Sequence, residues 1–248
     1  MAGHSKWAQI KRKKAVTDAR RGQLWTKLLK EVTVAARLGG ADPDNDARLR
    51  AAVQEAKASN VPNQNIERAI LKGTGDLEGG RLEELTYEGY GPAGVAILVE
   101  ALTDNKNRTV SEVRHLLSKH GGNLGENGCV AWLFDQRGYL TVSMAAMNED
   151  ELMEIAVVAG ADDFSVEGDN YEIFSAPENY LTLRAELDRH GVPVTSTQLA
   201  RLPKTTVPVD QEHAEPLLQL MELLEDHDDV QPVWANFEID DKLVEEGA

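Results

Sequence analysis

Apolar residues in the first part of the chain recur with the period of an α-helix. At about 100° per residue, one arc of the stretch that follows Asp18 is apolar and the opposite arc is mostly basic. The apolar arc consists of Leu24, Trp25, Leu28, Leu29, Val32, Ala35 and Ala36. Gly39 and Gly40 favour the end of this helix, because glycine commonly follows a last helical turn. We therefore predict one long helix with an apolar face for a core and a basic face for another contact.

Two shorter segments repeat the helical pattern before residue 80. DPDNDARLRAAVQEAKASN places on one side Leu49, Ala52, Val53 and Ala56. In VPNQNIERAILKG, Pro62 suits a first helical turn and Gly73 suits the helix end. Three helices of this size predict a small helical domain over residues 1–80.

After the polar linker DLEGGRLEE, the apolar pattern changes to that of strands. LTYEGYG and VAILVEAL read as strands, VSEVRHLLSKHGG reads as a helix, and CVAWLF reads as another strand. Cys129 would then be a small core residue of that last strand. This β-β-α-β order is one helix and one strand short of a closed α/β sandwich.

Residues 136–208 read as β-α-β-β-α-β, which is the order of a ferredoxin-like sandwich complete in itself. Asn148 should cap its first helix, and the acidic residues 149–151 follow where the helix dipole favours them. TSTQLARLPKTTVPV reads as the last strand of this sandwich. The final segments, QEHAEPLLQLMELLEDHDD and VQPVWANFEI, supply the helix and the strand that the earlier domain lacks.

The order of elements therefore predicts an α+β protein of three domains. The N-terminal three-helix domain covers residues 1–80, and two ferredoxin-like α/β sandwich domains follow it. One consists of residues 81–135 plus 209–248, and the other, residues 136–208, is inserted into it. A series of separate modules in line is the alternative that the order of elements leaves open.

Charge is distributed very unevenly along the chain. The 248 residues carry a formal net charge of −16, yet residues 1–37 hold ten Lys or Arg against two acidic residues. This segment is therefore +8, and the remainder must carry −24. A charge asymmetry of this size indicates two surfaces with different partners.

Composition excludes several classes of protein. The single cysteine, Cys129, rules out a disulfide within the monomer and a zinc cluster built on cysteines. No apolar run approaches the roughly 20 residues that span a bilayer, and no apolar region of a secretory signal follows Lys14. The basic start is closer to a transit peptide, but its pattern continues into helices without a processing break. We expect a soluble, cytoplasmic protein without a membrane partner.

Signatures of catalysis are absent from the sequence. It holds no P-loop, no G-x-S-x-G and no H-E-x-x-H, and its six histidines lack the spacing of metal ligands. Most carboxylates stand in runs that are typical of solvated faces. The glycine-rich stretches HGGNLGENG and GYGPAG are interpreted as turns rather than phosphate cradles. We expect no enzyme activity, no cofactor, no metal and no small-molecule substrate.

The N-terminal segment carries the main functional signal. Clustered Lys and Arg side chains bind phosphates through counterion release, without reading sequence. Trp7 either stacks on an unpaired base or anchors the segment to the helical domain. The predicted nucleic-acid contacts are His4, Ser5, Lys6, Trp7, Lys11, Arg12, Lys13, Lys14, Arg20, Arg21, Lys27 and Lys30.

The segment TDNKNRT is a candidate second anion contact. It leads from a strand into a helix N-terminus, where unpaired N–H groups favour anions. Its candidate residues, with two cations further along the same helix, are Asn105, Lys106, Arg108, Arg114 and Lys119. An ordinary capped helix with solvated cations is the alternative.

Several of these motifs resemble those of a known family. MAGHSKW, DARRGQLWTKLLKE, YEGYGPAGVA and TDNKNRTVSEVRHLLSKHGGNLG are similar to the YebC/PmpR family, which is related to the mitochondrial translational activator of cytochrome oxidase subunit I. The resemblance covers essentially the whole chain and is densest up to Phe134. Trp25 stands where the family suggests Phe, and Cys129 where it suggests Ser or Ala.

The resemblance implies an N-terminal helical domain, two α/β domains and a cytoplasmic regulator without enzyme activity. Members are described as DNA-binding transcriptional regulators, whereas organellar relatives act in translation and bacterial members have been tied to ribosomes and proline runs. We therefore expect a monomeric nucleic-acid-binding regulator, whose partner is promoter DNA or ribosomal RNA. An enzyme with carboxylates between the α/β domains and a purely protein-binding adaptor are the rival interpretations.

Overall fold

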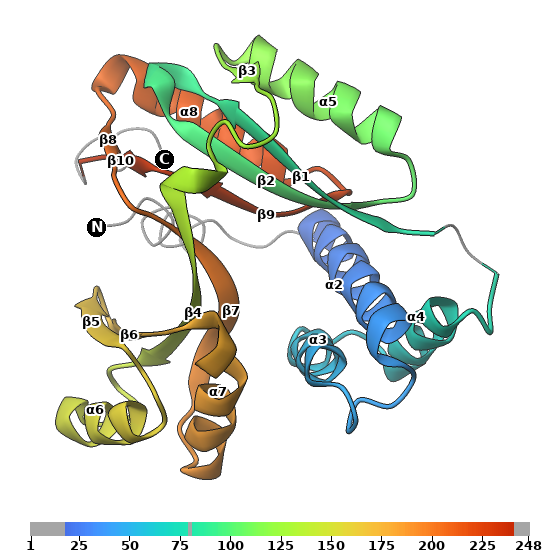
Figure 1. The fold of residues 1–248 in the computed structure, drawn as a ribbon, viewed down its shortest axis with the longest axis vertical. Helices are drawn as coiled ribbons and strands as arrows, with labels where there is room; N and C mark the ends of the chain where they lie inside the picture. Colours follow the sequence, from blue (N-terminus) through green and yellow to red (C-terminus); the bar gives the residue numbers. More distant parts are fainter. Residues whose placement is uncertain (1–17, 79–80, 241–248) are drawn as a thin grey trace. The chain divides into compact units, whose positions relative to one another are not determined.

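The computed structural model describes residues 18–78 and 81–240, with side chains from residue 21 onward. It is a mixed α+β protein, as the sequence predicted, and it divides into two compact units (Figure 1). Unit 1 comprises Met1–Leu133 with Thr205–Ala248, and unit 2 is Phe134–Lys204. The further division of unit 1 into a helical domain and an α/β domain stays a prediction.

Unit 1 begins with a group of helices that share one apolar core. They are α2 (Asp18–Gly39), α3 (Ala47–Ala58) and α4 (Asn63–Thr74). Val32 and Ala35 of α2 pack with Leu49 and Ala56 of α3, and all four are fully buried. The carboxylate of Asp46 caps α3 by accepting a hydrogen bond from the Leu49 amide at 2.7 Å.

Two expectations about these helices were wrong. Leu24 was placed on the apolar arc, but it is 43% exposed and lies outside the core. Gly73 was assigned to the end of α4, whereas the helix continues to Thr74 and ends at Gly75, which has a left-handed φ of 89°. Gly73 has a packing role instead, because a Cβ there would lie 2.3 Å from the carbonyl oxygen of Thr33 on α2.

The second part of unit 1 is a four-stranded antiparallel sheet in the order β3-β1-β2-β9. Its strands are β1 (Glu83–Tyr90), β2 (Ala96–Thr103), β3 (Asn123–Leu124) and β9 (Val230–Ala235). The helices α5 (Lys106–Lys119) and α8 (Gln211–Glu225) bury Val113, Leu117, Leu217 and Leu220 in the same core as Ile97 of β2. The chain leaves unit 1 after β3 and returns to it before α8, so β2 and β9 are neighbours despite their distance in sequence (Figure 1).

The segment CVAWLF does not form the predicted strand. Residues 129–130 lie in a loop, Ala131–Leu133 form a 3-10 turn, and β4 begins only at Phe134. The carboxylate of Glu88 accepts hydrogen bonds from the backbone N–H groups of Gly128, Val130 and Ala131, which are therefore not available to a sheet. Cys129 is accordingly a half-buried loop residue rather than part of a strand core.

Unit 2 is a β-α-β-β-α-β sandwich. Its strands β4 (Phe134–Ser143), β5 (Asp163–Glu167), β6 (Asn170–Ser175) and β7 (Val194–Pro203) form an antiparallel sheet in the order β5-β6-β4-β7. The helices α6 (Glu149–Val158) and α7 (Tyr180–Arg189) cover one face, where Leu152, Leu183 and Leu187 pack on Leu140 and Ile173. Asn148 caps α6, as predicted, by accepting a hydrogen bond from the Asp150 amide at 2.9 Å.

The predicted last strand of this sandwich is two strands in the structure. β7 ends at Pro203, which lacks the N–H that would continue the ladder. After residues 204–206, β8 (Val207–Pro208) pairs in parallel with β10 (Phe237–Glu238) in unit 1. The chain therefore changes units within the segment that the sequence presented as continuous.

Candidate nucleic-acid interface

The N-terminal candidates lie outside the described residues. This holds for His4, Ser5, Lys6, Trp7, Lys11, Arg12, Lys13 and Lys14. Arg20 is described only as a position in α2, and Arg21 is exposed near the start of that helix. The remaining candidates on α2, Lys27 and Lys30, are described in full.

Lys27 and Lys30 extend toward the C-terminal end of α8. The Lys27 Nζ donates a hydrogen bond to the carbonyl oxygen of Glu225, and the Lys30 Nζ donates one to the carbonyl oxygen of Asp228 at 2.9 Å. The Gln23 side chain binds the carbonyl oxygen of Asp226 at 3.2 Å. The last turn of α8 holds no basic residue of its own, so α2 supplies the cations that its negative end favours.

Asp229 is the centre of a buried polar cluster beside these contacts. It is 3% exposed, and its carboxylate binds the Lys30 Nζ and an Arg108 guanidinium nitrogen, both at 2.7 Å. The hydroxyl groups of Thr109 and Thr103 also donate to it, at 2.8 and 3.1 Å. Burial alone would raise the pKa of Asp229, but hydrogen bonds from Arg108, Lys30 and Thr109 hold that pKa far below its ordinary value.

The segment TDNKNRT takes part both in the start of α5 and in the cluster around Asp229. Asn105 caps α5 by accepting a hydrogen bond from the Arg108 amide at 3.2 Å. The Arg108 side chain binds Asp229 and, at 3.2 Å, Asp104. Asn105 and Arg108 therefore have roles within the fold. They are two of the five residues proposed from sequence as an anion contact. Lys106, Arg114 and Lys119 are exposed, and none of the three forms an ion pair in the described part of the chain.

His227 connects the loop of residues 226–229 to α5. Its Nε2 lies 2.7 Å from Glu112 Oε2, and its Nδ1 accepts a hydrogen bond from the Asp229 amide at 3.1 Å. This pair of contacts requires the proton on Nε2 in the neutral ring. The loop of residues 226–229 is thus bound by α2 and by α5.

A groove of about 1130 Å³ runs between these elements in unit 1. One wall is α4, where Arg68 and Lys72 are exposed one helical turn apart, and neither pairs with a carboxylate among the described residues. Asp104, Glu112 and Asp228 also line this groove. Among the cations that line this groove, those available to an anion therefore lie on α4, a helix that the sequence analysis did not select.

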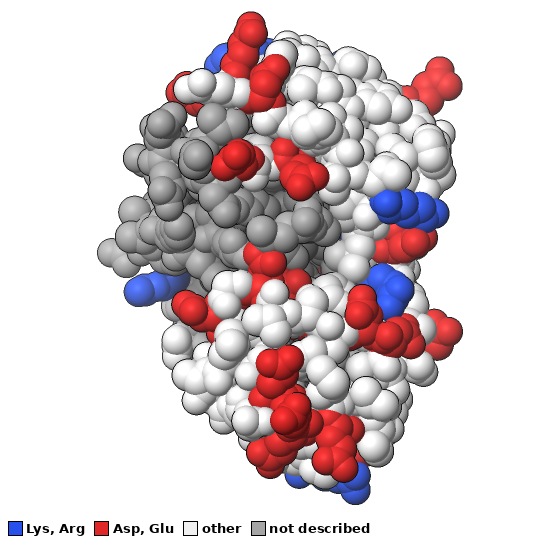
Figure 2. Space-filling model, turned by 90° about the vertical axis from the view of Figure 1, so that its left-hand side faces the viewer, with Lys and Arg blue, Asp and Glu red and all other residues white. Residues whose placement is uncertain are grey.

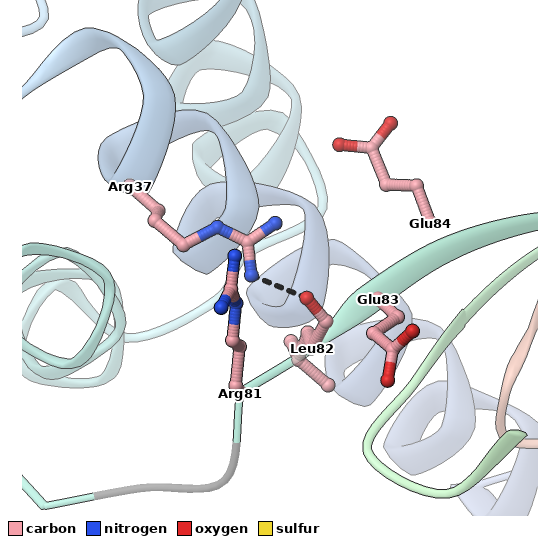
Figure 3. Close-up of a pocket in the computed structure, with 5 residues that line it drawn as sticks. All are labelled: Arg37, Arg81, Leu82, Glu83 and Glu84. Carbon is pink, nitrogen blue, oxygen red and sulfur yellow. Dashed lines mark hydrogen bonds between the residues drawn. The ribbon is translucent and has the colours of Figure 1, made fainter.

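A smaller hollow of about 450 Å³ lies where the chain enters β1. Figure 3 shows the guanidinium group of Arg37 on α2 beside that of Arg81, with a hydrogen bond from Arg37 to the carbonyl oxygen of Leu82. Glu83 and Glu84 also line this hollow, and Glu84 accepts a hydrogen bond from Arg48 at 3.2 Å. The sequence signal for Arg68 and Lys72 was their i, i+4 spacing, whereas nothing in sequence brings Arg37 and Arg81 together.

Two further properties bear on the class of protein. No group of three or more His, Cys, Asp or Glu residues in the described ranges could hold a metal ion. No helix among the same residues is both long and apolar enough to cross a membrane.

These features define an α+β protein in which cations of α2 bind the end of α8 and the buried carboxylate of Asp229 within unit 1. The chain belongs to the TACO1/YebC family: the N-terminal domain of that family matches residues 5–76, and its second and third domain matches residues 82–237.

Relatives of similar length support the assignment. A "probable transcriptional regulatory protein" of Natranaerobius thermophilus is 54% identical over 250 residues, covering 100% of both chains. One of the same description from Desulfosudis oleivorans is 52% identical over 245 residues, covering 99% of this chain and 100% of its own. The crystal structure of a conserved hypothetical protein from Aquifex aeolicus superposes with a TM-score of 0.88 at 49% identity, covering 95% of this chain and 98% of the other.

Proposed function

We propose that this protein is a nucleic-acid-binding regulator of gene expression that acts without catalysis, as a monomer in the cytoplasm. The observation that carries the proposal is the segregation of charge, with +8 on residues 1–37 and −24 on the rest. A basic segment on an acidic body is drawn to phosphate and orients the molecule, because the acidic body is repelled. The names of the relatives, probable transcriptional regulatory proteins, support a regulatory role.

The proposed phosphate contacts are the basic residues of the N-terminal segment. They are Lys6, Lys11, Arg12, Lys13, Lys14, Arg20 and Arg21, with His4, Ser5 and Trp7 beside them. Lys27 and Lys30 are left out of this set, because they bind carbonyl oxygens of unit 1 and the Asp229 carboxylate. Lys106, Arg114 and Lys119 on α5 are the proposed second contact.

Promoter DNA is the first candidate partner, following the description of the relatives. Ribosomal RNA is the second, with a role in translation elongation. The observation that favours RNA is the engagement of α2: its inner cations bind α8 and Asp229, so this helix does not present a row of free side chains to base edges. A segment that contacts phosphates without a base-reading helix suits a large structured RNA.

The test is crosslinking in living cells, followed by sequencing of the RNA and the DNA recovered with the full-length protein. Reads concentrated in ribosomal RNA would identify a translation factor, and reads concentrated upstream of a few genes would identify a transcriptional regulator. Recovery of both nucleic acids at background would contradict the proposal.

A matched pair of variants locates the contact. Changing Lys11, Arg12, Lys13 and Lys14 to Ala should weaken binding and lower the slope of log affinity against log salt by about 3–4. The control changes the same number of cations elsewhere, namely Lys57, Arg184, Arg189 and Lys204 to Ala. An equal loss in both variants would indicate a general effect of net charge and contradict a contact by this segment.

A further inference from the structure

The outer face of α6 in unit 2 exposes apolar side chains. Leu152 and Ala156 are buried at 0% and 1% exposure and hold the helix on its sheet. On the other side, Met153 is 37% exposed, Val157 is 62% exposed and Val158 is 84% exposed. Valine has a lower helix propensity than most residues, and at an exposed position no buried apolar area offsets this cost. These side chains therefore destabilise the helix unless another surface covers them.

Acidic residues are interleaved with these apolar ones. At about 100° per residue, Asp150 lies next to Val157 on the helix surface, and Glu154 lies between Val157 and Val158. Glu149 and Glu151 complete the first turn, and all four acidic residues are exposed. The lower half of Figure 2, where α6 faces the viewer, shows acidic side chains gathered together with basic ones only at the margin.

Within unit 2, which is described throughout, these four carboxylates form no ion pair. The cations of the unit are engaged elsewhere: Arg201 has a partner, and the other pairs are Arg137–Asp162, Arg184–Asp188, Arg189–Glu186 and Lys204–Asp135. The last turn of α6 also holds no basic residue, so its negative end is not offset by a charge of its own. The face therefore combines apolar side chains with unbalanced negative charge.

We propose that the outer face of α6 docks a basic amphipathic segment of a partner protein. Apolar side chains of that segment would cover Met153, Val157 and Val158, and its Lys or Arg residues would meet Asp150, Glu151 and Glu154. The same face of a second copy does not fit, because two such faces would bring like charges together. Nucleic acid does not fit either, since the face holds no cation and its carboxylates repel phosphate.

The small size of the α6 face determines how long the complex lasts and how it depends on salt. One helix face with three apolar anchors is small, so the contact is transient, sensitive to salt and fast to form. This surface goes beyond the proposed function and does not depend on it, because it consists of α6 residues, whereas the proposed phosphate contacts are residues of the N-terminal segment and of α5.

The first experiment measures binding of a fluorescein-labelled amphipathic helical peptide of leucine and lysine to the full chain by anisotropy. Changing Val157 and Val158 together to Ser should weaken binding about tenfold, because two buried valines are lost from the contact. Changing Glu151 and Glu154 together to Gln should weaken it roughly threefold at low salt and reduce its salt dependence. A scrambled peptide of the same composition, which has no apolar face, should bind weakly to every variant.

The matched control lies on the other helix of unit 2. Leu181 is 42% exposed on α7, and Glu178 is exposed just before it, so L181S with E178Q removes one apolar and one acidic side chain from a different face. This variant should bind the peptide as the unchanged chain does. Equal binding by all variants, or no binding by the unchanged chain, would overturn the proposal.

A second experiment tests the occupant in cells. A photo-crosslinking residue at Val158 of the full chain should attach, after nuclease treatment, to protein segments that are basic and carry an apolar face. The same residue at Leu181 should not enrich these segments. Attachment at Val158 only to a second copy of the chain, only to nucleic acid, or to segments without positive charge would overturn the proposal.

Discussion

Arg108 binds Asp229 over 2.7 Å, although 121 residues separate them in the chain. The same carboxylate binds Lys30, so one buried acid connects α2, α5 and the loop before β9. Segments that come before unit 2 in the chain are thereby bound, inside unit 1, to a segment that comes after it. The TDNKNRT segment thus serves the fold through Arg108, while its other cation, Lys106, remains exposed.

Replacing Asp229 by Ala should destabilise the full chain by about 2–3 kcal/mol. The change removes the carboxylate that balances Lys30 and Arg108 and that accepts hydrogen bonds from the hydroxyl groups of Thr103 and Thr109. Urea unfolding followed by circular dichroism measures the effect. Asp228→Ala is the neighbouring control, because that side chain is exposed, and it should change stability by less than about 0.5 kcal/mol. If both variants lost the same free energy of unfolding, the cluster around Asp229 would contribute little to stability.

Lys30 and Lys14 should behave in opposite ways. Lys30→Met removes contacts to Asp229 and to the carbonyl oxygen of Asp228, so it should lower stability by about 1–2 kcal/mol. The salt dependence of nucleic-acid binding should not change. Lys14→Met should instead lower the salt slope by about 1 and leave the urea midpoint unchanged. A lower slope for Lys30→Met without a loss of stability would return Lys30 to the phosphate contacts.

Glu88→Gln should destabilise the chain by about 1–3 kcal/mol. The carboxylate accepts three backbone hydrogen bonds at 2.6–2.8 Å, and the NH₂ group of glutamine would face one of these donors. Thermal unfolding measures the change. Glu126→Gln, an exposed acid in the loop that follows β3, should have no comparable effect. A neutral result for Glu88→Gln would show that this loop does not depend on the carboxylate.

Stability should also fall on acidification because of Glu88 and Asp229. Burial raises both pKa values, but backbone donors at Glu88 and the partners of Asp229 outweigh it, so both folded pKa values are lowered. A lowered folded pKa gives stability that is complete above about pH 5 and is lost as the pH falls through about 4 toward the folded pKa. Urea midpoints from pH 7 to pH 3 should therefore decrease, and less steeply in Asp229→Asn. Equal steepness in both proteins would contradict this account.

Two glycines in helices should respond to alanine with opposite signs. Gly73→Ala should destabilise by about 1–3 kcal/mol, because its Cβ would lie 2.3 Å from the Thr33 carbonyl oxygen and 2.8 Å from Ala36 Cβ. Gly22→Ala meets no atom within 4 Å and should stabilise α2 by roughly 0.5–1 kcal/mol. Thermal midpoints of the two variants compare them directly. Stabilisation by Gly73→Ala would show that α2 and α4 can separate at this crossing.

Local patterns in the sequence were sufficient for most of the elements. The helical period predicted the helices, and the cap at Asn148 was identified correctly because a cap is a contact between near neighbours in sequence. CVAWLF was misread because its strand propensity was genuine but Glu88, 40 residues away, binds the N–H groups that a strand would use. Gly73 was misread because a glycine at a helix crossing and a glycine at a helix end look the same in sequence.

The sequence by itself determined the α+β class, the basic segment and the acidic remainder, since these depend on periodicity and charge counts. Only the tertiary structure decided which cations are engaged. Lys27 meets the end of α8 across 198 residues, and Lys30 meets Asp229 across 199. A charge pattern states how many cations a helix face holds, but the partners of those cations come from segments that meet only when the chain packs.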